Sequence, residues 1–412
     1  MFGVIPLLFN LRLQGTTNDR LLSFITFRHV YPVETSHEYD IISFYAIPLC
    51  VRNDDGFNRW LSFLFEHKFL CSYYKRQYRF TTHNNNIHTM NKTILLLLFI
   101  FQAFISSAQT TQMMFGDTSR AGVPYSKDPH VVNFQGRYLM YYSIPPVKDD
   151  ENSGWNIGIA ASQNLTDWEK IGEITPAANA AYEKKGLCAP GALVRDGKVH
   201  LFYQTYGNGR NDAICHAISD DGINFERNPT NPIFSPTGDW NCGRAIDAEV
   251  CEFNNQYYLY FATRDPGYET QILGVAVAPK NTNFNREDWK QATDSPILAP
   301  ELPWEGQCIE GASITIQNGK MYMFYAGAYN NWPQQVGVAV SEDGIQWKRL
   351  FTEPFLPNGK PGEWNESESG HPHIFTDHDG RTYLFFQGNN DKGKTWYISN
   401  KEVFWKNGLP VF

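Results

Sequence analysis

Four of five evenly spaced positions in this chain carry side chains that can accept or donate protons. They are Asp128, Asp247, Glu310 and His371, and the remaining position is Ala189. In chain order the five positions are separated by 61, 58, 63 and 61 residues. Bringing three carboxylates to equivalent places costs free energy unless their charges serve a purpose. Hydrolysis of a glycosidic bond needs such a group, because one acid must protonate the leaving oxygen while a base activates water.

Each of these positions opens a segment with the pattern of a β-hairpin. An apolar strand leads into a Gly or Asn turn, and an aromatic-rich strand follows. The five segments span residues 127–143, 189–204, 247–262, 310–326 and 371–387. A second pair of short strands follows each hairpin, in residues 157–171, 214–228, 273–291, 336–350 and 396–408. Two hairpins per repeat make a four-stranded sheet, so the sequence predicts an all-β, five-bladed β-propeller with four-stranded blades.

The first strand of each blade lines the central axis of a propeller. We therefore expect the five opening residues to converge at one mouth of the central tunnel. The polar turns at 219–225 and 341–347 share a Ser-x-Asp-Gly pattern, and we expect them to close outer hairpins.

Composition and charge limit the classes of partner. Hydrophobic residues make up 42% of the chain, charged residues 19% and aromatic residues 15%, which is typical of a folded, strand-rich protein. The formal net charge is −8, whereas nucleic-acid binding needs a basic face. No apolar run of about 20 residues, the length of a membrane span, occurs in the C-terminal three quarters. We expect an uncharged oligosaccharide partner, no nucleic acid and no membrane span.

The first hundred residues differ from the rest. We predict a signal peptide at 90–108, with Lys92 as its positive region and an apolar stretch at 94–105. Residues 1–89 would then be translated upstream sequence or an unstructured leader, and 109–412 the propeller domain. The alternative is a true N-terminal domain followed by a buried apolar segment. If the signal-peptide hypothesis is correct, the protein is secreted or periplasmic.

The ordered set of acids resembles that of the glycoside hydrolases of family 43, whose relatives are families 62, 117, 32 and 68. The resemblance rests on Asp128-Pro129 followed by Gly-x-Tyr at 136–138, and on a second acid, Asp247. It also rests on the Glu-Gly-x-x-Ile segment at 310–314 and on a fifth-blade histidine, His371 or His373.

This resemblance implies roles for the acids. Asp128 would be the general base and Glu310 the general acid, while Asp247 would raise the pKa of Glu310 and orient it. An inverting reaction requires about 6.5–9.5 Å between the acid and the base, so that a water molecule fits. The resemblance implies no required cofactor, but it does suggest a structural calcium ion bound to His371 through water.

Two departures leave the identity of the acid open. Ala248 follows Asp247 where the family usually has Pro, and Ala312 follows Gly311 where Pro is common. The segment around His371 is also similar to the family 117 anhydro-galactosidases, in which a fifth-blade histidine would serve as the acid. The fructan-cleaving families 32 and 68 fit less well, because their Asn-Asp-Pro-Asn-Gly segment is missing.

The remaining candidates are substrate-binding residues: His371, His373, Arg244, Trp155 and Trp332. We expect an exported glycosidase that removes terminal sugars, with arabinofuranosyl or xylosyl units as first choice, from plant or algal oligosaccharides by inversion. The alternatives are a family 117-like anhydro-galactosidase with a histidine acid, and a propeller that binds carbohydrate without catalysis, because fold does not fix function.

Overall fold

The computed structural model contains two compact units, Met1–Phe101 and Gln102–Phe412. It describes residues 112–412 and, in the first unit, only four short strands. These are β1 (Phe9–Asn10), β2 (Phe24–Val30), β3 (Ile41–Ser43) and β4 (Ile47–Pro48), with β2 paired to the other three. The predicted signal peptide at 90–108, and the predicted leader apart from these strands, lie outside the described residues.

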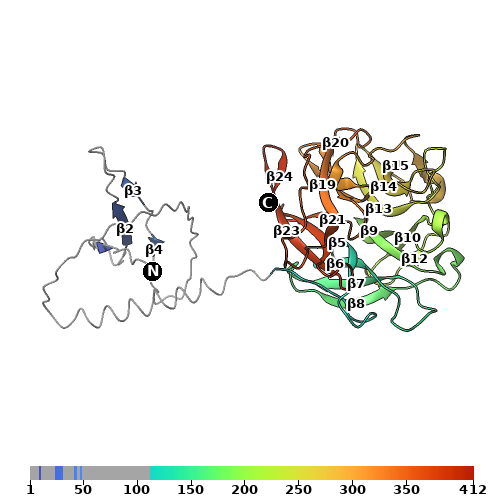
Figure 1. Ribbon diagram of the computed structural model, residues 1–412, viewed down its shortest axis with the longest axis horizontal. Coiled ribbons are helices and arrows are strands. Elements are labelled where there is room, and N and C mark those ends of the chain that lie inside the picture. The colour runs from blue at the N-terminus through green and yellow to red at the C-terminus, as the bar shows by residue number, and fades with distance from the viewer. Residues whose placement is uncertain (1–8, 11–23, 31–40, 44–46, 49–111) are drawn as a thin grey trace. The chain divides into compact units, whose positions relative to one another are not determined.

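Residues 127–411 form five antiparallel sheets of four strands each, which confirms the predicted five-bladed β-propeller (Figure 1). The first two blades contain β5 (Lys127–Phe134), β6 (Arg137–Ile144), β7 (Asn156–Ser162) and β8 (Glu169–Ile174), then β9 (Leu187–Arg195), β10 (Lys198–Thr205), β11 (Ile214–Ser219) and β12 (Glu226–Arg227). The third contains β13 (Ile246–Phe253), β14 (Gln256–Arg264), β15 (Gln271–Pro279) and β16 (Lys290–Gln291). The last two contain β17 (Ile309–Gln317), β18 (Lys320–Gly327), β19 (Gln335–Ser341) and β20 (Lys348–Arg349), then β21 (Glu368–Thr376), β22 (Thr382–Asn389), β23 (Tyr397–Lys406) and β24 (Leu409–Val411).

Helical structure in the described part is limited to four single turns of 3-10 helix. They are η1 (Ala181–Glu183), η2 (Gly209–Asn211), η3 (Arg286–Asp288) and η4 (Pro303–Glu305). Among the described residues, no helix has the length and apolar character needed to cross a membrane.

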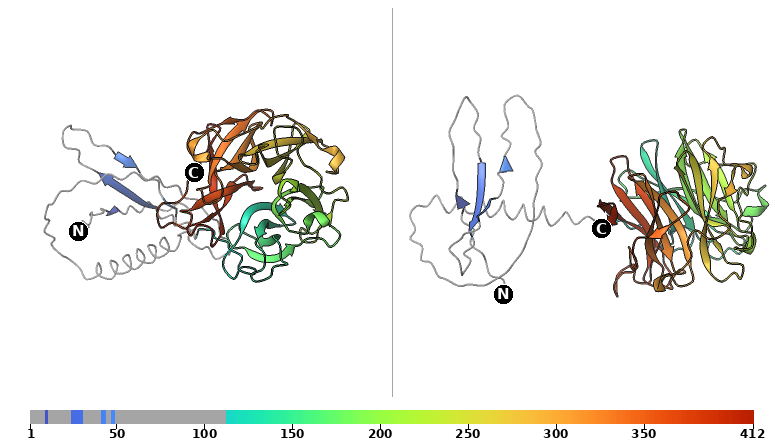
Figure 2. Two further views of the ribbon diagram at one scale, coloured as in Figure 1. Left: turned by 45° about the vertical axis from the view of Figure 1, so that its right-hand side comes forward. Right: turned by 90° about the horizontal axis from the view of Figure 1, so that it is seen from above.

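The blades close into a ring around a common axis (Figure 2). The inner strands β5, β9, β13, β17 and β21 contact one another in that order, and β21 returns to β5. The segment before the first blade helps to close the ring, because Phe115 pairs with Ile398 of β23 in the fifth blade.

Two-residue turns explain why the inner hairpins form where the sequence predicts them. Both central residues have positive φ in Gln135-Gly136, Asp196-Gly197, Asn254-Asn255 and Asn318-Gly319. This is the type I′ turn, whose twist matches that of paired strands and which favours Asn and Gly. The turn composition therefore fixes the pairing of the first two strands in four of the blades.

The two Ser-x-Asp-Gly turns close outer hairpins, as predicted, and they also contact the neighbouring blade. Gly222 and Gly344 have positive φ, and each donates its backbone N–H to the serine of its own turn at 2.8 Å. Their carbonyls accept 2.8 Å hydrogen bonds from Tyr141 and Tyr260, which belong to the preceding blades. Buried tyrosines thereby satisfy their hydroxyl groups and hold one blade against the next.

Candidate active site

Each inner strand has a break in register near its start, and the residue at this break has a left-handed backbone. The five residues are Asp128 (φ 52°), Ala189 (φ 45°), Asp247 (φ 55°), Gly311 (φ 58°) and His371 (φ 43°). Four of them are not glycine, so the surrounding structure must hold a backbone conformation that costs free energy. Such bulges re-aim side chains and are common next to active sites.

The fourth blade departs from the sequence-based alignment by one residue. We expected Glu310 to be equivalent to Asp128, but Gly311 occupies the left-handed position and Glu310 precedes it. Glu310 pairs with Ala326 in regular register, as Lys127 pairs with Ser143 in the first blade. The Glu310 side chain therefore starts from the neighbouring position of its strand, although it remains in the site.

Side chains from the preceding blade hold four of the five left-handed positions. In each case a side-chain oxygen accepts the backbone N–H of the strained residue. The pairs are Ser143 with Ala189 (2.7 Å), Gln204 with Asp247 (2.9 Å), Gln334 with His371 (3.1 Å) and Gln387 with Asp128 (2.9 Å). All four acceptors are buried, so these hydrogen bonds fix the bulges without water.

His371 lies between two carboxylates. Its Nε2 atom is 3.6 Å from Oδ1 of Asp128 and 3.5 Å from Oδ1 of Asp247. Burial alone would lower the pKa of His371, but Asp128, Asp247 and Glu310 together raise it to about 9. Burial opposes ionisation of Asp128, yet the charges of His371 and Lys127 outweigh it and lower the pKa of Asp128. At neutral pH His371 is therefore an imidazolium, and it lies beside the ionised Asp128.

Glu310 is in a different environment from Asp128. It is 7% exposed, and burial followed by the charge of Asp247 raises its pKa. Its Oε1 accepts a 2.6 Å hydrogen bond from Nε2 of Gln334, and Gln271 donates to its Oε2. One carboxyl group is thus pushed toward the protonated form and another toward the ionised form, which is the division that acid–base catalysis needs.

Two arginines orient Gln271. Its Oε1 accepts hydrogen bonds from Nε of Arg264 at 3.2 Å and from Nη1 of Arg244 at 3.4 Å, so its NH₂ group faces Glu310. Arg244 also lies 3.6 Å from Oδ2 of Asp212. The predicted substrate-binding Arg244 therefore has protein partners, and its first effect is to orient the side chain that contacts Glu310.

Comparison with known proteins adds an independent observation to this geometry. The sequence model of the glycosyl hydrolases family 43 matches residues 123–407, which is more than half of the chain. The chain belongs to glycosyl hydrolase family 43. It is accordingly a glycoside hydrolase, and the match covers every strand of the five blades except β24 (Leu409–Val411).

Individual relatives of this family 43 protein are distant. A 1,2-β-oligomannan phosphorylase from Thermoanaerobacter sp. (strain X514) is 25% identical over 52% of this chain and 68% of its own. A xylosidase/arabinosidase from Bacteroides ovatus is 25% identical over 34% of this chain and 43% of its own. The crystal structure of a thermostable family-43 glycoside hydrolase matches with a TM-score of 0.57 at 19% identity, over 69% of this chain and 92% of that one. At this identity the structural likeness concerns the fold alone.

The two tryptophans predicted to bind substrate, Trp155 and Trp332, have different surroundings in this protein. Trp155 is half-buried, with ring centroids 6.0 Å from Tyr125 and 5.7 Å from Tyr206. Trp332 is 79% exposed, in the loop between β18 and β19. The same loop contains Asn330, whose Oδ1 accepts a 3.0 Å hydrogen bond from the Gln387 that holds Asp128. Trp332 is thus an exposed aromatic ring on a loop anchored beside the acids.

His373, also predicted as a substrate-binding residue, contacts other groups than the acids. It is 5% exposed, its Nε2 lies 3.1 Å from the carbonyl oxygen of Val131, and its Nδ1 lies 3.2 Å from Oγ of Ser313. It lies two residues after His371 on the same strand, so it belongs to a second layer of side chains in the tunnel.

His371 was also predicted to hold a calcium ion through water. Calcium takes six to eight oxygen ligands, whereas an imidazolium has no lone pair to offer a metal or its water as acceptor. Nε2 of His371 lies 3.6 Å from Oδ1 of Asp128 and 3.5 Å from Oδ1 of Asp247, so its observed neighbours are two carboxylates and the calcium ion stays a prediction.

Four glutamines that organise the site were not predicted from the sequence. Gln204 and Gln387 lie near the end of the second strand of two hairpins, in the repeated segments FYQ and FFQ. Gln271 and Gln334 each stand two residues before the similar segments LGVAV and VGVAV, and both donate to Glu310. Recurrence of a polar residue at equivalent repeat positions was the signal that could have identified them.

Proposed function

We propose that this glycoside hydrolase removes terminal sugars from plant or algal oligosaccharides with inversion, and that arabinofuranosyl or xylosyl units are its first substrates. The observation that carries the proposal is the contrast between Glu310, whose pKa is raised, and Asp128, whose pKa is lowered. The name of the Bacteroides ovatus relative, a xylosidase/arabinosidase, supports the choice of sugar.

In the proposed reaction Glu310 is the general acid and Asp128 the general base. Water attacks the anomeric carbon while Asp128 accepts its proton, and Glu310 gives its own proton to the departing glycosidic oxygen. The charge of Asp247 favours the protonated form of Glu310 before the reaction. The His371 imidazolium offsets the negative charge of Asp128 and Asp247, which are both within 3.6 Å of its Nε2.

One observation favours the second candidate, a family 117-like reaction with a histidine acid. His371 keeps its proton to a pH of about 9 and lies 3.6 Å from the proposed base. A protonated imidazole at this place could give its proton to a leaving oxygen, and Glu310 would then serve in orientation only.

Product analysis with two variants separates these candidates. We would follow arabino-, xylo- and agar-type oligosaccharides by NMR, where inversion appears as a first-formed sugar of opposite anomeric configuration. Loss of the acid lowers kcat/KM on oligosaccharides by about 10²–10⁴-fold, and much less on aryl glycosides whose leaving group needs no proton. This pattern in Glu310→Gln supports the carboxylic acid, whereas the same pattern in His371→Asn supports the histidine.

The exposed Glu301→Gln serves as the control for removing a carboxylate, because Glu301 reaches Arg349 at the surface and not the site. Release of the retained anomer contradicts inversion. Release of no sugar from any arabinosyl, xylosyl or anhydro-galactosyl substrate contradicts the proposed substrate class and leaves the binding-only alternative.

We also propose that the protein is exported, either secreted or periplasmic, with the segment 90–108 as its signal. The support is the sequence pattern of a positive residue, a short apolar stretch and small residues at the end. N-terminal sequencing of protein recovered outside the cytoplasm tests this. A first residue near Gln109 supports it, whereas an intact start at Met1 contradicts it.

A further inference from the structure

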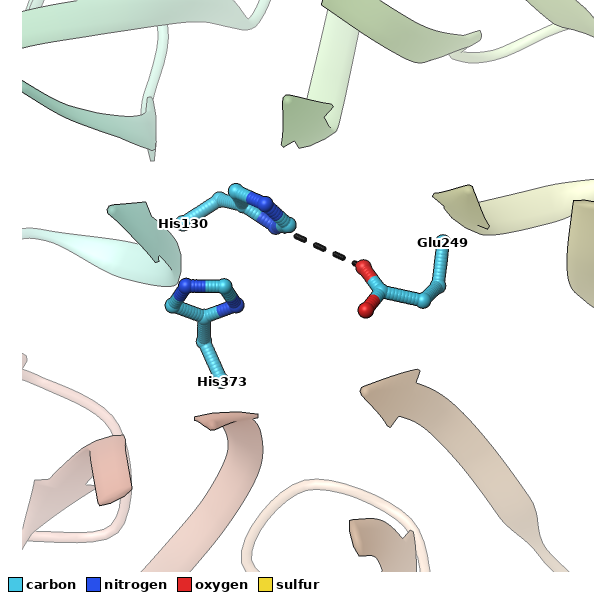
Figure 3. Close-up of side chains that lie close together, drawn as sticks. All are labelled: His130, Glu249 and His373. Atoms are coloured by element: carbon cyan, nitrogen blue, oxygen red, sulfur yellow. Dashed lines mark ion pairs between the residues drawn. The ribbon is translucent and has the colours of Figure 1, made fainter. Parts of the chain in front are cut away.

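A second layer of side chains lies directly beyond the acids in the tunnel. His130, Glu249 and His373 each come two residues after Asp128, Asp247 and His371 on the inner strands β5, β13 and β21. All three are buried, with exposures of 7%, 5% and 5%. Figure 3 shows them reaching toward one another from separate strands, and one potential metal-binding atom of each lies within 4.8 Å of the others.

Hydrogen bonds to the backbone fix which nitrogen of each ring faces this cluster. Nε2 of His130 lies 2.8 Å from the carbonyl oxygen of Ala192, and Nε2 of His373 lies 3.1 Å from that of Val131. A carbonyl oxygen only accepts, so in both rings Nε2 carries the hydrogen and the neutral ring has its lone pair on Nδ1. Histidine ligands of metals are oriented in this way, with the other ring N–H given to a carbonyl or carboxylate.

The lone pair of His130 then faces another acceptor. Its Nδ1 lies 3.7 Å from Oε2 of Glu249, a separation too long for a hydrogen bond. The other oxygen of Glu249 is already occupied, because Oε1 accepts a 2.8 Å hydrogen bond from the N–H of Ile314. Two acceptors that face each other in a buried place need either a proton or a metal cation between them.

The neighbouring hydrogen-bond donors do not resolve this contact. The hydroxyl of Ser313 lies 3.2 Å from Nδ1 of His373 and 3.4 Å from Oε1 of Glu249, so its single proton serves one of these two. The N–H of Ile374 donates to the Ser313 oxygen at 3.1 Å. Neither of these donors reaches Oε2 of Glu249 or Nδ1 of His130.

The donor set indicates the class of cation. Two imidazole nitrogens and one carboxylate suit zinc and its first-row neighbours, whereas calcium and magnesium prefer oxygen ligands only. Ligand atoms in a tetrahedral zinc site are about 3.3 Å apart. The 3.7 Å between His130 and Glu249 is close to this value, so a small inward movement would complete the pair.

We propose that His130, Glu249 and His373 bind one divalent transition-metal ion, of the zinc type, in the propeller tunnel. The ion would connect the first, third and fifth blades two residues beyond Asp128, Asp247 and His371. Its role would be structural, since it would hold in place the three strands whose bulges present those side chains. The proposal does not depend on the sugar or on which residue is the acid.

Metal content of the purified protein tests the site directly. The protein is stripped with a chelator and then equilibrated separately with Zn²⁺, Co²⁺, Mn²⁺ and Ca²⁺. We expect about one equivalent of zinc or cobalt per chain by elemental analysis, and a higher Tm with metal than without it. Glu249→Gln and His373→Gln should each lower metal affinity by about 10–100-fold or more and remove the Tm response.

Two matched controls keep the result specific. His200→Gln removes a buried histidine of β10 that contacts His216 instead of the cluster, and His378→Gln removes an exposed one. Both should bind zinc as the wild-type protein does. If Glu249→Gln and His373→Gln fail to fold, X-ray absorption of the zinc-loaded wild-type protein decides, and two imidazole ligands support the proposal.

Three outcomes overturn the proposal. One is a folded wild-type protein that takes up no zinc, cobalt or manganese, in which case a proton shared by the buried groups occupies the cluster. Another is full metal content in both cluster variants, which moves the ion elsewhere. The third is a preference for calcium, or a zinc site with oxygen ligands alone.

Discussion

Nε2 of Gln334 donates a 2.6 Å hydrogen bond to Oε1 of Glu310. The other end of the same amide, Oε1, accepts the backbone N–H of His371 at 3.1 Å. The amide orientation is fixed, because Nε2 also donates to the carbonyl oxygen of Ala328 at 3.0 Å. Gln334 therefore couples the position of the proposed acid in the fourth blade to the bulge of the fifth.

Gln334→Glu should move the basic limb of the pH–rate profile upward. The new carboxylate still accepts the His371 N–H, but it replaces a donor to Glu310 with a like charge, which raises the pKa of Glu310 further. We expect the basic limb of kcat/KM to rise by about 1 pH unit, with lower activity at neutral pH. The neighbouring Gln335→Glu is the control, because the Gln335 side chain accepts from Asn358 and not from the site. An unchanged basic limb in Gln334→Glu would contradict Glu310 as the titrating acid.

Gly311→Ala should reduce activity more than its backbone strain alone explains. Gly311 has φ +58°, and an added Cβ would lie 3.2–3.3 Å from three atoms of the His371 ring. Gly319 has φ +75° in a hairpin turn, where a Cβ would meet nothing within 4 Å. Each change to Ala should cost about 1–2 kcal/mol of unfolding free energy, because both positions are left-handed.

Only Gly311→Ala should also lower kcat, through displacement of the His371 ring. Denaturant unfolding and steady-state kinetics on both variants measure the two effects separately. Equal activity losses in Gly311→Ala and Gly319→Ala would show that the contact with His371 has no consequence for catalysis.

The fold could be predicted because its signals are local and repeated. Type I′ turns at Asp196-Gly197 and Asn318-Gly319, alternating strands and a regular repeat specify the hairpins without any knowledge of packing. The repeat spacing alone was enough to select Asp128 and Asp247 as candidate site residues. Glu310 was displaced by one residue because the bulge adds a residue to the strand, which a sequence alignment cannot place.

The remainder of the site depends on contacts between blades. Gln387 holds Asp128 across 259 positions of sequence, and His130 reaches the carbonyl of Ala192 in the next blade. Glu249 was not among the residues predicted for the site. Its meeting with His130 and His373 depends on three strands from different blades, so no local pattern identifies it.

The stability of the wild-type protein should decrease between neutral and alkaline pH because of His371. Its pKa is about 9 in the folded protein and close to 6.5 in the unfolded chain, so the folded state binds more protons between these values. The stabilisation is complete below pH 6.5 and is lost as the pH rises through about 9.

We expect this loss to be about 1–3 kcal/mol of unfolding free energy in wild type and to be absent in His371→Asn. Urea unfolding at pH 6.5, 8 and 9.5 measures it. His378→Asn controls for loss of a histidine at the surface, where the side chain is 74% exposed. A His371→Asn protein with the same alkaline loss as wild type would show that another group is responsible.

Asp247→Asn should shift the activity profile in the direction opposite to Gln334→Glu. After burial, the Asp247 charge is the largest contribution that raises the pKa of Glu310, so its removal should lower that pKa. The Glu310 proton is then lost at lower pH, and the basic limb of kcat/KM should move to more acidic values. Asparagine is isosteric with aspartate, and its backbone N–H can still donate to Gln204, so the bulge should survive.

Asp247→Asn also removes one of the two carboxylates that hold the His371 proton. A histidine acid would therefore lose its proton at lower pH as well, and combining Asp247→Asn with Glu310→Gln separates the two. If the downward shift persists in the double variant, His371 is the titrating acid, and if it disappears with the remaining activity, Glu310 is.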